Sequence, residues 1–353
     1  KKLDLSFNQI GDEGGMKIGS NTTWVNLEEL CLKDNNLAIK SSVAIGKNKT
    51  WRKLKVLDLS GNKLGNSGAS NLAQNTTWTN LTTLSLDAND IGPKGAEDLS
   101  KNGTWTNLRI LCLDCNKIGP EGAEKLRLNQ SWTSLRVFNL GSNGLGSEGA
   151  FELRNKTWTN VLALNLRSNL IGVEGASFLR KYAILPYLQK LDLQNNALGS
   201  KGVEKLSKNT TWTGLRMLNL SDNSIDDGGA EALGRNKAWR KLQTLDLHSN
   251  LIGDKGIIGL VIHQSWTKLK VLDLSWNRIG PLGTDYISKE WSELEALDLQ
   301  SNRIGDKGAE NLSNNHVWAE LHTLNLSDNN ISEEGADYLR KNRYWRKLKD
   351  LRY

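Results

Sequence analysis

The chain has 353 residues, of which 38% are hydrophobic and 24% charged, a composition typical of a folded, soluble protein. No apolar run approaches the roughly 20 residues that a membrane-spanning helix needs, so the sequence predicts no membrane insertion. The net charge of +7 permits nucleic-acid binding only if the cations cluster on one face. The three cysteines, Cys31, Cys112 and Cys115, are too few for a disulfide framework and favour a reducing compartment such as the cytoplasm.

A repeat of 27 residues runs through the whole sequence. It reads LDLSFNQIG from Leu3 and LCLKDNNLA from Leu30, and it continues with one step of 26 residues into Leu164 and one of 25 into Leu297. Thirteen repeats result, and we expect them to form a single domain over residues 1–353. Both ends fall inside a repeat, and because solenoid ends need capping segments, the sequence predicts a piece of a longer protein.

Each repeat is predicted to form one strand and one helix. In the third repeat Leu57 and Leu59 point to one side of a strand and Asp58 to the other, while Ala69 and Leu72 are spaced for one helix face. A unit this small cannot bury its own apolar face, so neighbouring units must stack. The expected fold is therefore an α/β solenoid of horseshoe shape, with parallel strands on the concave face and helices on the convex face.

One asparagine follows the strand in every repeat. Buried backbone groups at a turn need partners, and an inward amide can both donate and accept hydrogen bonds to successive turns. We interpret these residues as a structural ladder and not as a catalytic row. They are Asn8, Asn35, Asn62, Asn89, Asn116, Asn143, Asn169, Asn196, Asn223, Asn250, Asn277, Asn302 and Asn329.

Twelve of the thirteen tryptophans also share one register and are predicted to form an aromatic spine in the core. The seventh repeat departs from this pattern and reads KYAILPYLQK around Leu185 and Pro186, where we expect a kink or an altered helix end. The spine residues are Trp24, Trp51, Trp78, Trp105, Trp132, Trp158, Trp212, Trp239, Trp266, Trp291, Trp318 and Trp345.

Units of the form LxLxxNxIGxxGA resemble the ribonuclease-inhibitor-like class of leucine-rich repeats over essentially the whole chain. Within that class, IGDEGG, IGPEGA and NxTWxxL resemble repeats at the receptor ends of NOD-like receptors. The resemblance implies the solenoid fold and a binding function. Ran GTPase-activating proteins belong to the same class but carry a long acidic tail that this segment lacks, and the cysteine-rich ribonuclease inhibitors match poorly.

The open strand positions are the predicted binding surface, because their side chains do not pack in the core and successive repeats place them side by side. Aspartate dominates these positions, and Lys33 and Arg167 are the cations that we find among them. The face is therefore predicted to attract a protein with a basic surface and to repel nucleic acid. Solvated charge in a repeated consensus is the alternative. The aspartates are Asp4, Asp34, Asp58, Asp87, Asp114, Asp192, Asp222, Asp246, Asp273, Asp298 and Asp328.

Trp276 does not belong to the spine, since it takes an open strand position that holds Gly61, Ala88 or Ser142 in other repeats. An exposed large aromatic residue is a common interface anchor, although an idle surface residue is the alternative. We predict that it binds the partner together with neighbours from adjacent repeats. These are His248, Asp246, Asp273, Asp298, Asp222 and Gln300, with Arg278 and Arg303 just beyond the asparagine ladder.

We predict no catalytic, cofactor or metal site. The pair Cys112 and Cys115 lacks the further ligands that zinc needs, and the four histidines are scattered with no serine and carboxylate in triad order. The IGxxG glycines recur for turn geometry and do not form a phosphate loop. Seven Asn-x-Thr or Asn-x-Ser sequons share one register, and a helix-ending asparagine explains them as well as glycosylation does.

The function predicted from the sequence is a non-enzymatic protein-binding module, either a receptor or a scaffold. A GTPase regulator resembling Ran GTPase-activating proteins and a structural component of a large assembly are the alternatives.

Overall fold

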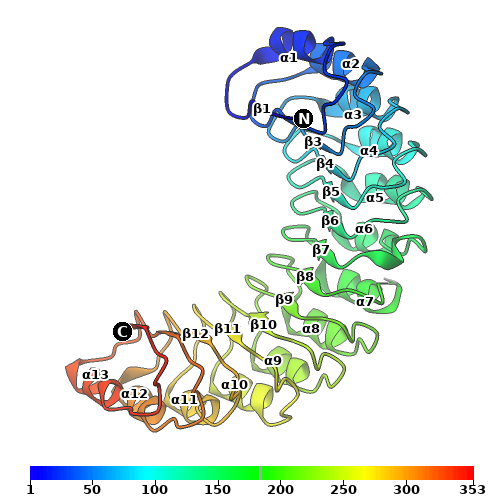
Figure 1. Cartoon of the computed structure of the whole chain (residues 1–353). Helices are drawn as coiled ribbons and strands as arrows, with labels where there is room; N and C mark the ends of the chain where they lie inside the picture. The colour runs from blue at the N-terminus through cyan, green and yellow to red at the C-terminus, as the bar shows by residue number, and fades with distance from the viewer. Residues whose placement is uncertain (183–184) are drawn as a thin grey trace. The chain divides into compact units, whose positions relative to one another are not determined.

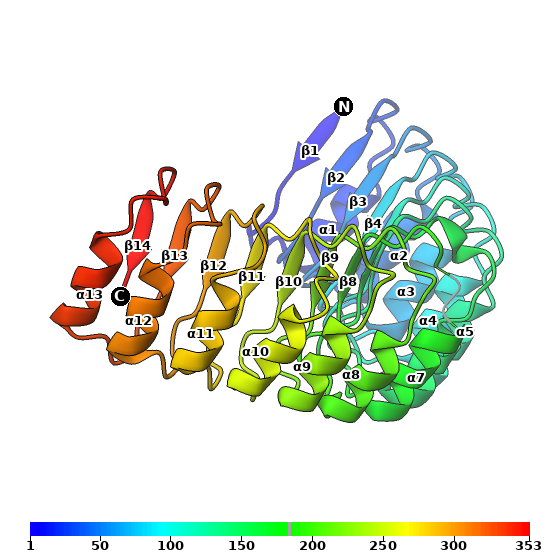
Figure 2. The ribbon, with the colours of Figure 1, turned by 90° about the horizontal axis from the view of Figure 1, so that it is seen from below.

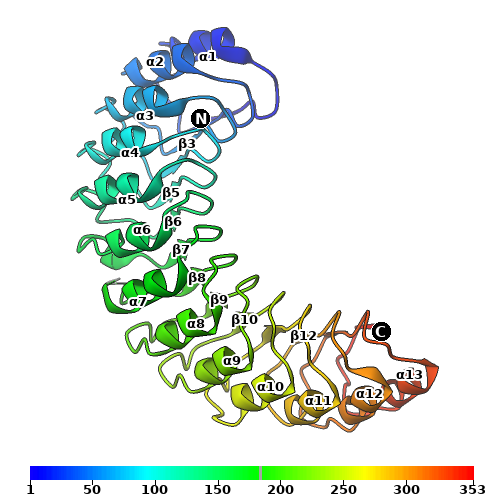
Figure 3. The ribbon, with the colours of Figure 1, turned by 180° about the vertical axis from the view of Figure 1, so that it is seen from behind.

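The computed structural model describes residues 1–182 and 185–353, and it divides into two compact units. Unit one comprises Lys1–Ile171 with Tyr182–Tyr187, and unit two comprises Gly172–Lys181 with Leu188–Tyr353. Within each unit, strands and helices alternate along the chain, as the change of apolar period predicts. The strands lie on one side and the helices on the other, so each unit is a stack of strand–helix repeats (Figures 1 and 3).

The strands are three residues long, and within each unit they pair in parallel with the strand of the next repeat. The central leucine of one strand is level with that of its neighbour, as Leu245 is with Leu272, so the repeats are in register. Figure 2 shows the last strands of unit two side by side. Unit one contains β1 (Lys2–Asp4), β2 (Glu29–Cys31), β3 (Val56–Asp58), β4 (Thr83–Ser85), β5 (Ile110–Cys112), β6 (Val137–Asn139) and β7 (Ala163–Asn165). Unit two contains β8 (Lys190–Asp192), β9 (Met217–Asn219), β10 (Thr244–Asp246), β11 (Val271–Asp273), β12 (Ala296–Asp298), β13 (Thr323–Asn325) and β14 (Asp350–Arg352).

The helices are short, and neighbouring helices pack against each other from α1 to α6 in unit one and from α8 to α13 in unit two. Unit one has α1 (Gly11–Gly19), α2 (Ile39–Lys47), α3 (Gly65–Ala73), α4 (Pro93–Ser100), α5 (Gly119–Arg127), α6 (Gly146–Glu152) and a 3₁₀ turn at Trp158–Asn160. The others are α7 (Gly172–Tyr182), α8 (Gly199–Ser207), α9 (Asp227–Gly234), α10 (Asp254–Val261), α11 (Pro281–Ile287), α12 (Gly305–Ser313) and α13 (Glu333–Arg340).

The core between the two layers consists of stacked leucines and of the tryptophan spine. Most spine tryptophans are fully buried, and rings of adjacent repeats stack, as those of Trp24 and Trp51 do at a centroid distance of 6.5 Å. The centroids of Trp212 and Trp239 lie 6.5 Å apart, and those of Trp318 and Trp345 lie 6.4 Å apart. The predicted packing role of this register is therefore confirmed.

The asparagine ladder is confirmed in atomic detail at Asn62. Its Oδ1 accepts the backbone N–H of Asn35 at 3.1 Å and that of Leu37 at 2.8 Å, both in the preceding repeat. Its Nδ2 donates to the carbonyl of Leu32 at 3.0 Å and to that of Leu59 at 2.8 Å. One amide thus joins two successive turns, which is why the residue recurs.

The asparagines of the sequons have a similar structural role at the ends of the helices. Asn75 is 3% exposed, and its Nδ2 donates to the carbonyls of Gly46 at 2.9 Å and Asn48 at 2.8 Å. Its Oδ1 accepts the N–H of Thr77 at 2.8 Å. These bonds favour the structural interpretation of the register over glycosylation, since the amide nitrogen is already used inside the fold.

The seventh repeat differs from its neighbours at its helix. Helix α7 has 11 residues, whereas α8 has 9. Leu185 is buried after the helix and Pro186 is exposed. The altered helix end is therefore present, and a kink at residues 183–184 lies outside the described residues.

Candidate functional site

The open side of the sheet in unit two, here called the strand face, carries the predicted site. On β11 the burial alternates, with Val271 exposed, Leu272 buried and Asp273 half-buried. The residues on either side of each central leucine therefore point away from the core, and they form two rows across the strands.

One of these rows is acidic. Asp246, Asp273 and Asp298 are level with one another on β10, β11 and β12. Neighbouring strands lie about 4.8 Å apart, so the three carboxylates are close to one another. Burial, followed by the charges of Asp273 and Asp192, raises the pKa of Asp246 above its usual range.

Two carboxylates in this row each keep one oxygen open. Asp246 accepts the N–H of His248 at 2.9 Å through Oδ1, and Asp273 accepts the N–H of Ser275 at 2.9 Å through Oδ1. The Oδ2 atoms of Asp246 and Asp273 have no hydrogen-bond partner within residues 1–182 and 185–353. In contrast, Oδ2 of Asp298 accepts the amide of Asn325 at 2.9 Å. The open oxygens can accept hydrogen bonds from a partner.

A short hydrogen-bonded chain connects two of these repeats. The hydroxyl of Ser275 donates to Oδ1 of Asp273 at 2.5 Å, and Nδ1 of His248 lies 2.7 Å from Ser275 Oγ. A carboxylate only accepts, so the single hydroxyl proton is directed to Asp273 and the imidazole N–H donates to the hydroxyl. Ser275 is buried and its proton is committed to Asp273, so this group is not arranged as a nucleophile with a base.

Trp276 lies in the turn after β11 and not on the strand, which corrects the sequence-based placement. Its φ of 54° is left-handed, and a strand cannot continue through that conformation. The equivalent position is left-handed throughout the described repeats, so Asp34, Asp222 and Asp328 also lie in turns and not on strands as predicted. The Trp276 side chain is nevertheless 58% exposed, and its backbone N–H donates to the carbonyl of Gln300 at 2.8 Å.

Two other predicted site residues are partly engaged inside the protein. Oδ2 of Asp222 accepts the side-chain amide of Gln194 at 2.9 Å. Gln300 donates to Oδ2 of Asp328 at 2.9 Å through Nε2 and accepts from Asn325 at 3.2 Å through Oε1. These bonds leave Asp222 and Gln300 less able than Asp246 and Asp273 to contact a partner.

Arg278 and Arg303 lie at the edge of the strand face, each one residue after a ladder asparagine. The backbone N–H of Arg278 donates to the carbonyl of Ile252, and that of Arg303 donates to the carbonyl of Ile279. The two arginines thus occupy equivalent places in adjacent repeats, and both are exposed.

The sequence interpretation missed the row that precedes the central leucines. Met217 is 39% exposed and Val271 is 37% exposed, and both point to the same side as the aspartates. Lys190 on β8 and Arg352 on β14 are also exposed on the strand face. The sequence interpretation named only Lys33 and Arg167, which both lie in unit one. The strict alternation of a strand could have revealed this row, since the residue before Leu shares a side with the residue after it.

The corresponding face of unit one is acidic as well, and one of its carboxylates, Asp114, has both oxygens bonded inside the protein. Burial, together with the charges of Asp114 and Asp58, raises the pKa of Asp87 to about 6. Asp114 accepts the N–H of Gly141 at 2.8 Å and the amide of Asn165 at 2.9 Å. Both oxygens of Asp114 are thus used inside the protein, whereas Asp58 accepts the N–H of Ser60 at 3.0 Å through Oδ1, as Asp273 does with Ser275.

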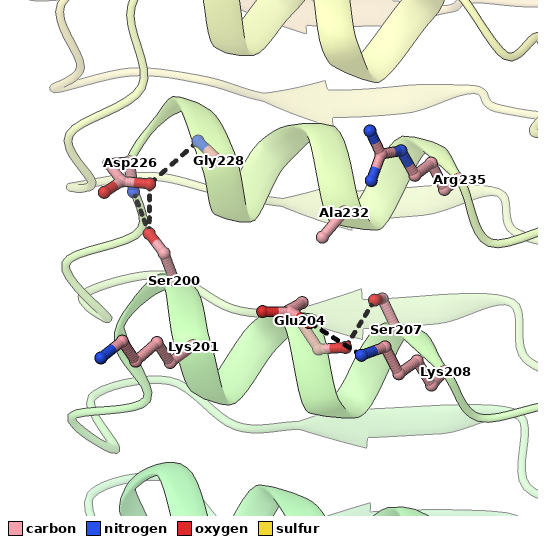
Figure 4. Close-up of a pocket in the computed structure, with 9 residues that line it drawn as sticks. All are labelled: Ser200, Lys201, Glu204, Ser207, Lys208, Asp226, Gly228, Ala232 and Arg235. Carbon is pink, nitrogen blue, oxygen red and sulfur yellow. Dashed lines mark hydrogen bonds and ion pairs between the residues drawn. The ribbon is translucent and has the colours of Figure 1, made fainter.

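A polar groove lies between α8 and α9 on the helix side of unit two, with a volume of about 750 Å³ (Figure 4). Figure 4 shows Asp226 beside Ser200 and Gly228 at one end. Glu204 and Lys208 form an ion pair of 2.7 Å at the other end. Arg235 pairs with Glu231, so three of the charged side chains in the groove are already in ion pairs, and the groove is a weaker candidate than the strand face. It is lined by Ser200, Lys201, Glu204, Ser207, Lys208, Asp226, Gly228, Ala232 and Arg235.

The thiols offer little chemistry. Burial raises the pKa of the Cys112 thiol to about 12, and its sulfur accepts the amide of Asn139 at 3.3 Å. In the part of the chain that the structure describes, no three His, Cys, Asp or Glu side chains are grouped to hold a metal ion. None of the described helices has the length and apolar character needed to cross a membrane.

Comparison with known proteins identifies the repeat. The family model described as "Leucine Rich repeat" matches residues 1–19, 52–73, 79–100, 106–126, 133–153, 159–179, 185–207, 215–234, 240–261, 267–288, 293–313 and 321–339. Among solved structures, an internalin (inlF) from Listeria monocytogenes str. 4b F2365 is similar, with a TM-score of 0.51 and 18% identity over 99% of this chain and 98% of that one. At this identity the likeness shows the fold alone. No curated protein sequence matches the chain.

Proposed function

We infer a function from the premise that the chain belongs to the leucine-rich repeat family. Leucine-rich repeat proteins generally mediate protein–protein interactions and are typically not enzymes. We propose that this chain is a protein-binding module, a receptor or a scaffold, and that it holds its partner on the strand face of unit two.

A single observation carries this proposal: a large exposed aromatic residue lies beside carboxylates that have open oxygens. Trp276 follows β11 by three residues, and Asp273 ends that strand. Aromatic residues dominate the energy of protein interfaces because they exclude water over a large area. Val271 adds exposed apolar surface on the same strand.

The charge of the face favours a partner with a basic surface. Asp246, Asp273 and Asp298 form an uninterrupted row, and the open oxygens of the first two can accept hydrogen bonds from lysine or arginine. A row of this sign repels the phosphates of nucleic acid. Binding should therefore be electrostatically steered and sensitive to salt.

The variant Trp276→Ala tests the proposal. We expect it to weaken partner capture by the intact protein at least about 30-fold, which is the effect of losing about 2 kcal/mol at an interface anchor. Its melting temperature should stay within about 2 °C of the parent, since exposed positions contribute little to stability.

Phe7→Ala is the matched control. Phe7 occupies the same turn position in the first repeat, is 68% exposed and is also left-handed, with φ at 62°. It lies in unit one, so its replacement should leave capture unchanged. Equal affinity of Trp276→Ala and the parent would remove the site, and an equal loss in both variants would show an unspecific effect.

The finer classification is also a proposal. The 27-residue units that alternate strand and helix support the ribonuclease-inhibitor-like class and the resemblance to NOD-like receptors. The single domain over residues 1–353, the longer parent protein and the reducing compartment stay predictions. The alternatives of a GTPase regulator and an assembly component are tested by GTP hydrolysis with small GTPases and by stoichiometric copurification, respectively.

A further inference from the structure

A row of turn residues runs along the edge of the strand face, one residue after each ladder asparagine. In unit one, Asp90 and Lys117 occupy this row in adjacent repeats, and their contact shows how far apart neighbouring members are. Their Nζ and Oδ1 atoms form an ion pair of 2.7 Å. Neighbouring side chains in this row can therefore reach each other.

In unit two the same row places two positive charges next to each other. Arg278 and Arg303 take the places that Lys117 and Asp90 take in unit one, and both side chains are exposed. Neither guanidinium makes an ion pair or a hydrogen bond with any residue in 1–182 or 185–353. The flanking members of the row are Leu251 and Asn330, which supply no negative charge.

Two carboxylates at the starts of α10 and α11 are already bonded to the backbone. Asp254 accepts the N–H groups of Gly280 at 2.7 Å and Gly283 at 2.8 Å at the start of α11. Asp227 accepts the N–H groups of Gly253 at 2.7 Å and Gly256 at 2.9 Å at the start of α10. Each carboxylate thus accepts hydrogen bonds from the N–H groups at the start of a helix, which otherwise lack partners within the helix.

Two adjacent guanidiniums without a counter-charge form a site for an oxyanion. Guanidinium groups bind carboxylates and phosphates through paired N–H donors, and two of them can share one such group. We propose that Arg278 and Arg303 bind a carboxylate or phosphate group of the protein partner beside Trp276. This inference rests on the proposed function, and it adds the chemistry of the partner at this edge.

The partner segment then has a polarity. Its basic groups lie over Asp246 and Asp273, and its anionic group lies over Arg278 and Arg303. The exposed Trp276 ring is between the two in the sequence of the turn. A partner that carries only positive charge can pair with the aspartates of the strand face but offers no group to bind Arg278 and Arg303.

Quenching of Trp276 fluorescence tests the site without any partner. Iodide is an anionic quencher and acrylamide is a neutral one, and the difference between the parent and Trp276→Phe isolates the signal of this tryptophan. If the arginine pair concentrates anions, the double variant Arg278→Gln with Arg303→Gln should lower the iodide quenching constant about threefold. Quenching by acrylamide should not change, because the exposure of the ring is unaltered.

Competition identifies the anion. At constant ionic strength, sodium phosphate or sodium acetate should protect Trp276 from iodide in the parent with saturation, and should not protect it in the double variant. Protection by phosphate alone assigns a phosphate group, and protection by acetate alone assigns a carboxylate. Lys117→Gln is the control, since that lysine occupies the same row but is paired with Asp90.

Equal iodide quenching in the parent and the double variant would overturn the proposal, and so would protection by neither phosphate nor acetate. These results are independent of the Trp276→Ala capture experiment. If Trp276→Ala loses capture but the double arginine variant leaves iodide quenching unchanged, the binding face is supported and the anion site is refuted. If the arginine pair concentrates iodide but Trp276→Ala does not affect capture, the anion site is supported and the role of Trp276 as an anchor is refuted.

Discussion

Asn250 joins two turns of the ladder directly beside the candidate site, and its replacement by alanine should destabilise the protein strongly. Its Oδ1 accepts the backbone N–H of Asn223 at 3.1 Å and that of Ile225 at 2.9 Å. Its Nδ2 donates to the carbonyls of Leu220 at 3.1 Å and Leu247 at 2.9 Å. Nδ2 also donates to the carbonyl of His248 at 3.1 Å, and Asn250→Ala removes all five bonds from a buried position.

The two N–H donors determine the magnitude. A buried donor that loses its acceptor costs about 1–3 kcal/mol, so the two together predict a loss of about 2–6 kcal/mol in the free energy of unfolding. The carbonyls have a second lone pair and contribute less. Urea unfolding followed by far-ultraviolet circular dichroism should show a lower midpoint with an unchanged slope.

Asn8→Ala is the matched control, because Asn8 is the exposed first member of the ladder. Its Nδ2 donates to the carbonyls of Leu5 and Ser6, each at 2.9 Å, and its replacement should cost under about 1 kcal/mol. A loss for Asn250→Ala within about 0.5 kcal/mol of that for Asn8→Ala would refute the role of the buried amide.

Two further predictions concern stability. The raised pKa of Asp87, about 6 against an ordinary 3.8, means that the folded state binds a proton more tightly than the unfolded state. Stability should therefore fall as the pH rises from about 4 to 7, and Asp87→Asn, which retains an acceptor for the N–H of Asp114 at 2.7 Å, should remove that fall in thermal melts. An unchanged pH profile in this variant would contradict the assignment. Trp318 donates its indole N–H to the carbonyl of Glu290 at 2.8 Å, whereas the buried indole N–H of Trp239 has no partner. Trp318→Phe should therefore cost about 1 kcal/mol more than Trp239→Phe in urea unfolding, and equal losses would count against the bond.

The sequence alone determined the fold class, because the 27-residue period repeats the same physical requirements in each unit. The leucines, the ladder asparagines such as Asn62 and the tryptophans such as Trp212 each satisfy a burial or hydrogen-bonding need that recurs at fixed spacing. The buried amide of each ladder asparagine bonds to the turn of the preceding repeat. The spacing of the asparagines in the sequence therefore indicates which turns are in contact. Stacking in register follows from that, and no long-range information is needed.

The candidate site was only partly predictable, because it depends on where individual residues depart from the repeat and on which neighbours they bond to. The sequence indicated that Trp276 departs from the repeat, but the left-handed backbone that places it in a turn depends on the ladder bonds around it. Whether a carboxylate keeps an open oxygen also depends on neighbours 27 or 28 residues away: Asn325 bonds to Asp298, and Gln194 bonds to Asp222. Periodicity states which residues point outward. Only the packed repeats decide which outward groups are already bonded to one another and which, like Arg278, are left for a partner.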